Sequence, residues 1–200
     1  MVIMATVSLG AVVAGTVMAM DNEANRPSFN INVIGARKQL SSDWKPTDQQ
    51  DEIGGDFDMR GNNWPVLLNF AYLYATQKDH ADELISVGNV TTAFTNLERE
   101  ATTEELDLGI KKIWTDESRL SFSLAGGAAW IKGRLKFMDT AKFDDSKLGW
   151  YGSAAIYYTF FNFLNVGVNA RYSDVKLTLG SRDDINAGGF HYGALVGFHF

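Results

Sequence analysis

Large apolar side chains occupy every second position in several stretches of the chain, with small or polar residues between them. The clearest stretch is 188–200, GGFHYGALVGFHF, in which the alternation continues to the last residue. Because successive side chains of a β-strand point to opposite faces, this period of two predicts a strand with one apolar face and one face of small or polar groups.

Segments of the same kind recur along the chain, separated by turn-rich or charged stretches. No convincing helical pattern lies between them, so the sequence predicts an all-β, antiparallel sheet of eight strands. The connections after the second, fourth and sixth strands are short, whereas the others are longer and carry most of the charge. The expected strands are 29–40, 50–59, 66–77, 103–114, 120–137, 148–160, 163–179 and 188–200.

The connection between residues 78 and 102 allows two interpretations. Its stretch VGNVTTAFTNL alternates as well, which favours an extension of the third and fourth strands as a hairpin. A mobile lid is the alternative for a connection of this length. The three prolines, Pro27, Pro46 and Pro65, lie outside the expected strands, as paired strands require.

The size of the apolar side chains indicates which face of the sheet points outward. The interior of an eight-stranded barrel holds only close-fitting side chains or one small ligand. Trp114, Trp130 and Trp150, together with Phe160 and Phe200, would overfill it. The apolar face therefore points outward to lipid, and the sequence predicts an eight-stranded antiparallel up-and-down transmembrane β-barrel over residues 28–200.

The inward register of this barrel collects charged residues among Gly, Ala, Ser and Asn. Acids and bases in so narrow a lumen would lie close enough to pair, because unpaired buried ions are very costly. A structural plug of ion pairs is the favoured interpretation, and a proton or ion path is the alternative. The pattern loses its phase near residues 35–38, which leaves Arg37 and Lys38 unassigned. The expected polar network of the lumen is Glu52, Asp56, Asp58, Glu105, Asp107, Lys111, Arg171, His191 and His199.

Aromatic residues are expected where the barrel wall crosses the two membrane interfaces. Aromatic belts on both sides of an apolar band are typical of transmembrane barrels. The residues that we assign to these belts are Trp64, Trp114, Trp130, Trp150, Phe160, Tyr172 and Phe200.

The first twenty residues contain no charged side chain and are rich in Val, Ala and Met. Val17 and Ala19 have the small-residue spacing of a secretory cleavage site. We interpret 1–19 as a signal peptide and 20–27 as a short N-terminal periplasmic segment, although no Lys or Arg precedes the apolar run. A membrane anchor of about minimum length is the alternative.

Composition excludes several classes of function. The formal net charge of −6 and the lack of a basic cluster argue against nucleic-acid binding. The chain has no Cys, which excludes disulfides, Cys-based zinc sites and a thiol nucleophile. We expect no cofactor.

The last eight residues, GALVGFHF, resemble the C-terminal insertion signal that the barrel-assembly machinery recognises. Its apolar face is Val196, Phe198 and Phe200, together with Tyr192 just before the motif. Together with the signal-like start and the eight alternating strands, this motif makes residues 28–200 similar to the small bacterial outer-membrane β-barrels of the OmpA and OmpW type. The resemblance implies a monomer in the bacterial outer membrane, in contact with lipid and lipopolysaccharide. Members of this family stabilise the membrane, act as adhesins or conduct small hydrophobic molecules.

Candidate chemistry is sparse. Lipid A deacylases of this size require a Ser two residues from a His near the C-terminus, but His191 is followed by Gly193 at that spacing. No phosphate-binding loop, HExxH or GxSxG motif is present. Acid pairs in 142–147 and 181–186 are candidates for a divalent cation that bridges lipopolysaccharide phosphates, and His80 among acids is a weaker metal candidate.

The sequence therefore favours a non-enzymatic barrel with a side-chain-filled lumen and a structural or surface-interaction role through four outer loops. A conduit for small hydrophobic molecules is the first alternative, and a lipid A-modifying enzyme is the second.

Overall fold

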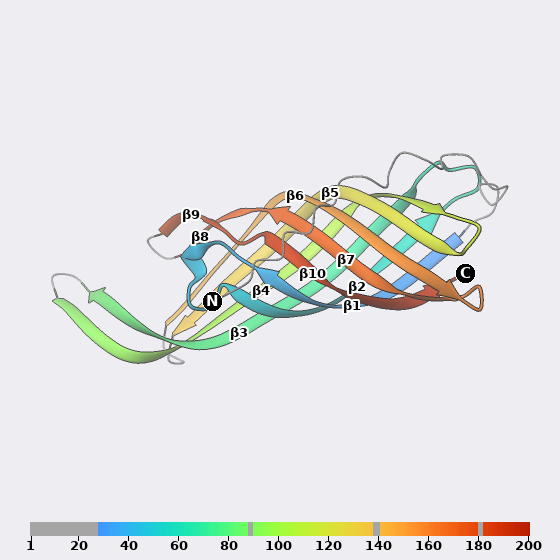
Figure 1. The fold of residues 1–200 in the computed structure, drawn as a ribbon. Helices are drawn as coiled ribbons and strands as arrows, with labels where there is room; N and C mark the ends of the chain where they lie inside the picture. Colours follow the sequence, from blue (N-terminus) through green and yellow to red (C-terminus); the bar gives the residue numbers. More distant parts are fainter. Residues whose placement is uncertain (1–27, 88–89, 138–140, 180–181) are drawn as a thin grey trace, which may run out of the picture.

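The computed structural model describes residues 28–87, 90–137, 141–179 and 182–200. The predicted signal peptide and the segment 20–27 lie outside the described residues. Nearly all of the described chain is β-strand (Figure 1).

Eight strands form a closed barrel in which each strand pairs antiparallel with its neighbours. The last strand closes the barrel against the first, with Val33 opposite Val196. Backbone hydrogen bonds of 2.9 Å in both directions join Phe29 to the C-terminal Phe200. The predicted fold class is confirmed. The strands are β1 (Ser28–Gln39), β2 (Gln49–Arg60), β3 (Leu67–Val87), β4 (Val90–Thr115), β5 (Leu120–Phe137), β6 (Ala141–Phe160), β7 (Leu164–Asp174) and β10 (Gly189–His199).

Two small elements lie outside the barrel wall, at its long-loop end. A 3₁₀ turn, η2 (Ser42–Trp44), connects β1 to β2. The hairpin of β8 (Lys176–Leu179) and β9 (Arg182–Asn186) connects β7 to β10 and forms a separate two-stranded sheet.

The prediction of one strand over 163–179 is therefore wrong. The barrel strand ends at Asp174, and β8 belongs to the separate sheet. The apolar positions explain the break, because they are even-numbered up to Tyr172 and odd-numbered from Val175 onward. Leu177 and Leu179 are buried in an apolar cluster inside the barrel mouth and do not face lipid.

The expected alternation of short and long connections holds only in part, because paired strands extend through the expected long connections after the third and fifth strands. The connections 61–66, 116–119 and 161–163 are short. At the other end, β3 and β4 continue as a hairpin to the pair Val87–Val90, which confirms the hairpin interpretation of 78–102. This hairpin extends beyond the neighbouring strands (Figure 1), and β6 begins at Ala141, earlier than expected.

The outward face of the wall is strongly apolar. Leu148 is 71% exposed, Leu108 63% and Val168 60%. Monomeric soluble proteins rarely expose apolar patches of this extent, so the wall meets hydrocarbon. The inward register of β1 continues without a break through Ile34 and Lys38 to the end of the strand, and the predicted loss of phase is absent.

No helix among the described residues is both long enough and apolar enough to cross a membrane.

Candidate functional site in the lumen

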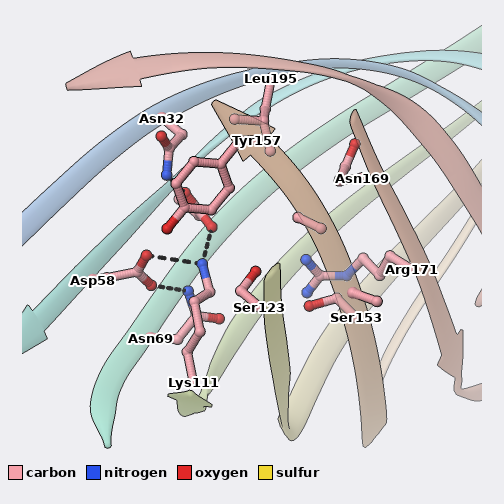
Figure 2. Close-up of a pocket in the computed structure, with 13 residues that line it drawn as sticks. Asn32, Asp58, Asn69, Lys111, Ser123, Ser153, Tyr157, Asn169, Arg171 and Leu195 are labelled. Atoms are coloured by element: carbon pink, nitrogen blue, oxygen red, sulfur yellow. Dashed lines mark hydrogen bonds and ion pairs between the residues drawn. The ribbon is translucent and has the colours of Figure 1, made fainter. Parts of the chain in front are cut away.

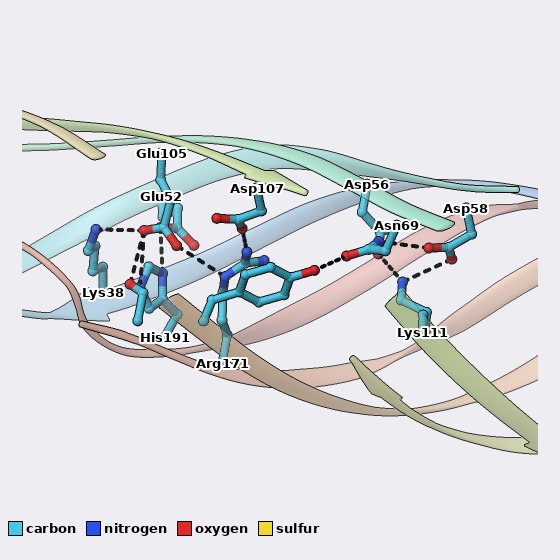
Figure 3. Close-up of polar contacts among 12 residues, drawn as sticks. Lys38, Glu52, Asp56, Asp58, Asn69, Glu105, Asp107, Lys111, Arg171 and His191 are labelled. Atoms are coloured by element: carbon cyan, nitrogen blue, oxygen red, sulfur yellow. Dashed lines mark hydrogen bonds and ion pairs between the residues drawn. The ribbon is translucent and has the colours of Figure 1, made fainter. Parts of the chain in front are cut away.

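Glu105 of β4 is the centre of a buried ionic cluster in the half of the lumen nearer the long loops, which we call the Glu105 cluster (Figure 3). Lys38 Nζ donates to Glu105 Oε2 at 3.1 Å, and Arg171 Nε donates to Glu105 Oε1 at 3.2 Å. The Ser173 hydroxyl donates to Oε2 at 3.1 Å. Both oxygens of this carboxylate, which is 1% exposed, are thus satisfied by groups from two other strands, β1 and β7.

His191 of β10 completes the Glu105 cluster. Its Nδ1 lies 2.7 Å from Glu52 Oε2, and its Nε2 lies 3.3 Å from Ser173 Oγ and 3.7 Å from Glu105 Oε2. The ring is fully buried. His191 therefore links the carboxylates of β2 and β4 across the barrel.

Ser173, His191 and Glu52 stand in the order hydroxyl, imidazole, carboxylate that hydrolytic triads use. All three side chains are buried, and the Ser173 hydroxyl also faces Glu105. A lipid acyl chain meets the outer wall, on the opposite side of the strands. The arrangement therefore holds the lumen together and presents no nucleophile to lipid.

Arg171 connects the Glu105 cluster to the middle of the lumen. Its Nη2 contacts Asp107 Oδ2, and its guanidinium lies 4.4 Å from the centre of the Tyr151 ring. Such stacking on an aromatic face suits the planar, weakly hydrated guanidinium. Tyr151 OH donates to Asn69 Oδ1 at 2.7 Å, which joins this region to the next group of charges.

Lys111 of β4 is the centre of a second group nearer the short turns, the Lys111 cluster (Figure 3). Its ammonium contacts Asp56 and lies 2.9 Å from Asp58 Oδ2. Asn32 donates to Asp56 at 2.6 Å, and Asn69 donates to Asp58 at 2.7 Å. Each carboxylate thus has a cation and an amide donor, as buried acids require.

A small polar cavity of about 30 Å³ lies beside the Lys111 cluster (Figure 2). A cavity needs roughly 10–15 Å³ to hold one water molecule, so this one accommodates about two. It is too small for an organic solute. Its labelled lining residues in Figure 2 are Asn32, Asp58, Asn69, Lys111, Ser123, Ser153, Tyr157, Asn169, Arg171 and Leu195.

A cluster of buried apolar side chains lies at the long-loop end of the lumen. We call this group the mouth plug. Trp44 of η2 is completely buried in it, and the hairpin β8–β9 contributes Leu177 and Ile185. The plug packs against lumen-facing residues of β4, β5 and β6. The whole apolar cluster is Leu40, Trp44, Ala101, Ala129, Ile131, Leu135, Tyr151, Val175, Leu177, Leu179, Ile185 and Ala187.

Hydrogen bonds hold the plug in place. Trp44 Nε1 donates to the carbonyl oxygen of Asn186 at 2.8 Å, so the buried indole N–H is satisfied. The backbone N–H of Thr178 donates to Asp145 Oδ2 at 2.8 Å. This bond is the main cause that lowers the pKa of Asp145, which lies beyond the membrane-spanning part of β6.

Gly133 of β5 allows the plug to approach the wall closely. A Cβ at this position would lie 2.6 Å from Leu177 Cδ1 and 3.1 Å from Trp44 Cη2. The absence of a side chain thus gives room to both the loop tryptophan and the hairpin leucine.

The residues predicted for the lumen network all lie on the inward register. Glu52, Asp56, Asp58, Glu105, Asp107, Lys111, Arg171 and His191 make up the two clusters. His199 lies apart from them, with Nδ1 2.9 Å from Asn30 Oδ1 near the short turns. Sequence reasoning missed Lys38, Ser173 and Trp44. An unbroken alternation through 28–38 would have placed Lys38 in the lumen, but no local signal indicated that Trp44 is buried there.

The predicted belt aromatics lie on the outward face. Trp130, Trp150 and Tyr172 are exposed toward the long-loop end, where the last two rings are 5.6 Å apart. At the short-turn end the exposed predicted aromatics are Trp64, Trp114, Phe160 and Phe200. The apolar face of the C-terminal motif, Tyr192, Val196, Phe198 and Phe200, also points outward.

The cation candidates in 181–186 and around His80 include side chains that lie outside the described residues. Among the side chains that the structure describes, no three His, Asp or Glu residues converge as a metal site. Asp144 lies 3.9 Å from Lys132, and Asp145 lies 3.7 Å from Lys147.

No protein-family model matches the sequence, and no curated protein is similar to it in sequence. Solved structures are nevertheless similar in fold. OprG from Pseudomonas aeruginosa matches with a TM-score of 0.54 at 12% identity, over 88% of this chain and 97% of that one. Ail from Yersinia pestis, in complex with the heparin analogue sucrose octasulfate, matches with a TM-score of 0.53 at 12% identity, over 87% and 97%.

The neisserial surface protein NspA matches with a TM-score of 0.52 at 9% identity, over 86% of this chain and 95% of that one. All three are small outer-membrane barrels, and the predicted resemblance is confirmed at the level of the fold. The closed barrel, its apolar outer wall and this shared fold make the chain an integral protein of the bacterial outer membrane.

Proposed function

We propose that this barrel has a structural or surface-interaction role in the outer membrane, and that it neither conducts solutes nor modifies lipid. The observation that carries the proposal is the mouth plug, which lies across the lumen at the long-loop end. The Glu105 and Lys111 clusters fill the lumen below it. A solute would have to displace both an apolar core and buried ion pairs.

The orientation follows the length of the connections, with the long loops outside the cell. The hairpin of β3 and β4 then extends furthest from the membrane and is the part of the chain best placed to meet other molecules. Ail, one of the proteins similar in fold, is named for attachment and invasion, which supports the view that such barrels serve surface interaction.

The expected partners follow from the same arrangement. Outer-membrane lipid and lipopolysaccharide surround the apolar wall, and the barrel-assembly machinery recognises the C-terminal motif during insertion. The barrel acts as a monomer, because closure of β10 on β1 leaves no strand edge of the wall unpaired within the membrane.

Conductance in planar bilayers tests the closed lumen. We expect no steady conductance from the refolded barrel. The variant Trp44→Ala should open intermittently, because it removes the largest side chain of the plug, whereas Ser42→Ala in the exposed part of the same turn should stay closed. Steady conductance by the unaltered protein would refute the proposal.

Uptake by cells distinguishes the structural role from the conduit. Deletion of the gene should leave unchanged or increase the entry of a small hydrophobic dye if the barrel stabilises the membrane. If the barrel is a conduit, deletion should instead decrease dye entry, and reintroduction of the intact gene should restore it. Mass spectrometry of lipid A from overexpressing cells should show no change, and an altered acyl pattern would favour the enzyme.

A further inference from the structure

We propose that the outward face of β5 beyond Trp130 binds phosphate groups of a glycolipid in the outer leaflet. This inference goes beyond the role proposed above and does not depend on a closed lumen. It rests on a column of basic side chains, Lys132, Arg134 and Lys136, which occupy alternate positions on one face of the strand.

The height of the column matches a headgroup layer. Trp130 is an exposed aromatic on the same face and lies at the long-loop belt, next to Leu148 on β6. Lys132 follows it at the next outward position, about 7 Å further along the strand. Basic groups just past an aromatic belt meet the phosphates of the lipid rather than its acyl chains.

Lys132 and Arg134 retain capacity for an anion. Arg134 Nη2 lies 3.7 Å from Glu104 Oε1, and Lys132 Nζ lies 3.9 Å from Asp144 Oδ2. Both separations exceed hydrogen-bond length, and such partly exposed ion pairs contribute little. The carboxylates therefore hold these cations only weakly.

Arg134 gives the most direct indication of a ligand. Its Nε is inaccessible to solvent and has no hydrogen-bond partner within the described structure. A guanidinium presents a fixed fork of donors that matches phosphate oxygens, and an arginine–phosphate pair is often bidentate. A phosphate seated between Lys132 and Arg134 would pair with the partly exposed guanidinium, which must turn outward for this N–H to reach the phosphate.

Two other outward basic residues, Arg37 and Lys112, make hydrogen bonds that Lys132 and Arg134 lack. Arg37 Nε donates to Asp51 at 3.2 Å, and Lys112 Nζ donates to the carbonyl oxygen of Pro65 at 2.7 Å. Lys112 also lies at the short-turn end, in the opposite leaflet. These two residues provide a matched control, because the double variant Arg37→Gln/Lys112→Gln removes two positive charges from the outward face, as Lys132→Gln/Arg134→Gln does.

The test uses the full barrel in phosphatidylcholine vesicles, with and without rough lipopolysaccharide whose lipid A carries its phosphates. The measurement is the temperature at which the folded band converts to the unfolded band on a gel. Phosphorylated glycolipid should raise this temperature for the unaltered protein. In Lys132→Gln/Arg134→Gln the apparent affinity, taken from a glycolipid titration, should fall by about tenfold or more.

Arg37→Gln/Lys112→Gln should keep the full response, and all variants should convert at the same temperature without glycolipid, which shows that they fold. Lipopolysaccharide stripped of its phosphates, or inorganic phosphate added to plain vesicles, should have no effect. The proposal fails if glycolipid stabilises Lys132→Gln/Arg134→Gln as much as the unaltered protein, or if the control variant loses as much affinity as Lys132→Gln/Arg134→Gln. It also fails if dephosphorylated glycolipid raises the conversion temperature equally well.

Discussion

The mouth plug and the two ionic clusters fill the same lumen by different physical means. The clusters consist of side chains on the barrel strands themselves. Four carboxylates there face the three basic groups Lys38, Lys111 and Arg171, and a fifth, Glu52, faces His191. The plug consists largely of residues from two connections that fold back into the mouth. The clusters depend on ion pairs and hydrogen bonds, and the plug depends on buried apolar area.

This difference predicts two kinds of failure. Removal of one partner from an ionic cluster leaves other charges buried without compensation, and the barrel strands that carry them cannot move away independently. Removal of plug area can be relieved locally, because η2 and the β8–β9 hairpin can open while the barrel wall stays paired.

The largest effect is expected at Glu105. Glu105→Gln leaves Lys38 and Arg171 without their shared carboxylate and should lower the free energy of unfolding by about 3–5 kcal/mol. The measurement is a urea titration of the barrel in lipid-free detergent. Glu104→Gln is the matched control, because this neighbouring side chain points outward and lies 3.7 Å from Arg134 in a surface ion pair. The substitution should lower the free energy of unfolding by less than about 1 kcal/mol. Equal losses in the two variants would contradict the role of the cluster.

The next largest effect is expected from a substitution in the mouth plug. Trp44→Ala should cost at most about 3 kcal/mol, the lower end of the range for buried tryptophan, since the hairpin can detach alone. Amide hydrogen exchange should accelerate at Leu177 and Ile185 and remain slow in β4 and β5. Uniform acceleration over all strands would mean that plug and wall unfold as one unit.

A smaller effect is expected where the two regions meet. Tyr151→Phe keeps the ring in the plug and under Arg171 but removes the hydrogen bond to Asn69. The loss should be about 1 kcal/mol in the same urea titration. Tyr158→Phe, the same change on the outward face of β6, should be close to neutral. If Tyr151→Phe is also neutral, the link between the clusters contributes no stability.

The smallest effect concerns an acid outside the lumen, Asp116 in the turn between β4 and β5. Hydrogen bonds from the Ser118 hydroxyl and from the backbone of Leu120 and Ser118 lower its pKa below the ordinary 3.8. Its contribution is therefore present above that value and is lost as the pH falls through the lowered pKa. Asp116→Asn should differ slightly from the unaltered protein at neutral pH and converge with it in acid, as measured by the urea midpoint. A difference that persists in acid would exclude this cause.

Much of the wall could be predicted from the sequence. An alternation of period two fixes which residues share a face, and the size of Trp114, Trp130 and Trp150 excludes an inward orientation. The inward positions of Glu105, Lys111 and Arg171 follow from the same periodicity. Lys38 was missed only because Gly35 and Ala36 are too small to continue the apolar pattern, although the backbone alternation continues through them.

The candidate site was predictable only in composition. The sequence placed acids and bases on one face, but it did not show that Lys38 and Arg171 from separate strands share Glu105. That choice depends on the stagger between strands, which brings β1, β4 and β7 to the same height in the closed barrel. Likewise, Ser173 meets His191 only once β7 and β10 are paired.

The sequence by itself determined the period, and therefore the strands, their faces and the lipid-facing wall, because side-chain direction in a strand depends only on position. Tertiary structure alone decided that a buried apolar cluster forms at the barrel mouth. Trp44, Leu177 and Gly133 are far apart along the chain, and their contact arises only after two connections fold back into the same space. No local pattern encodes that contact, since burial of a loop residue depends on which distant surface is there to receive it.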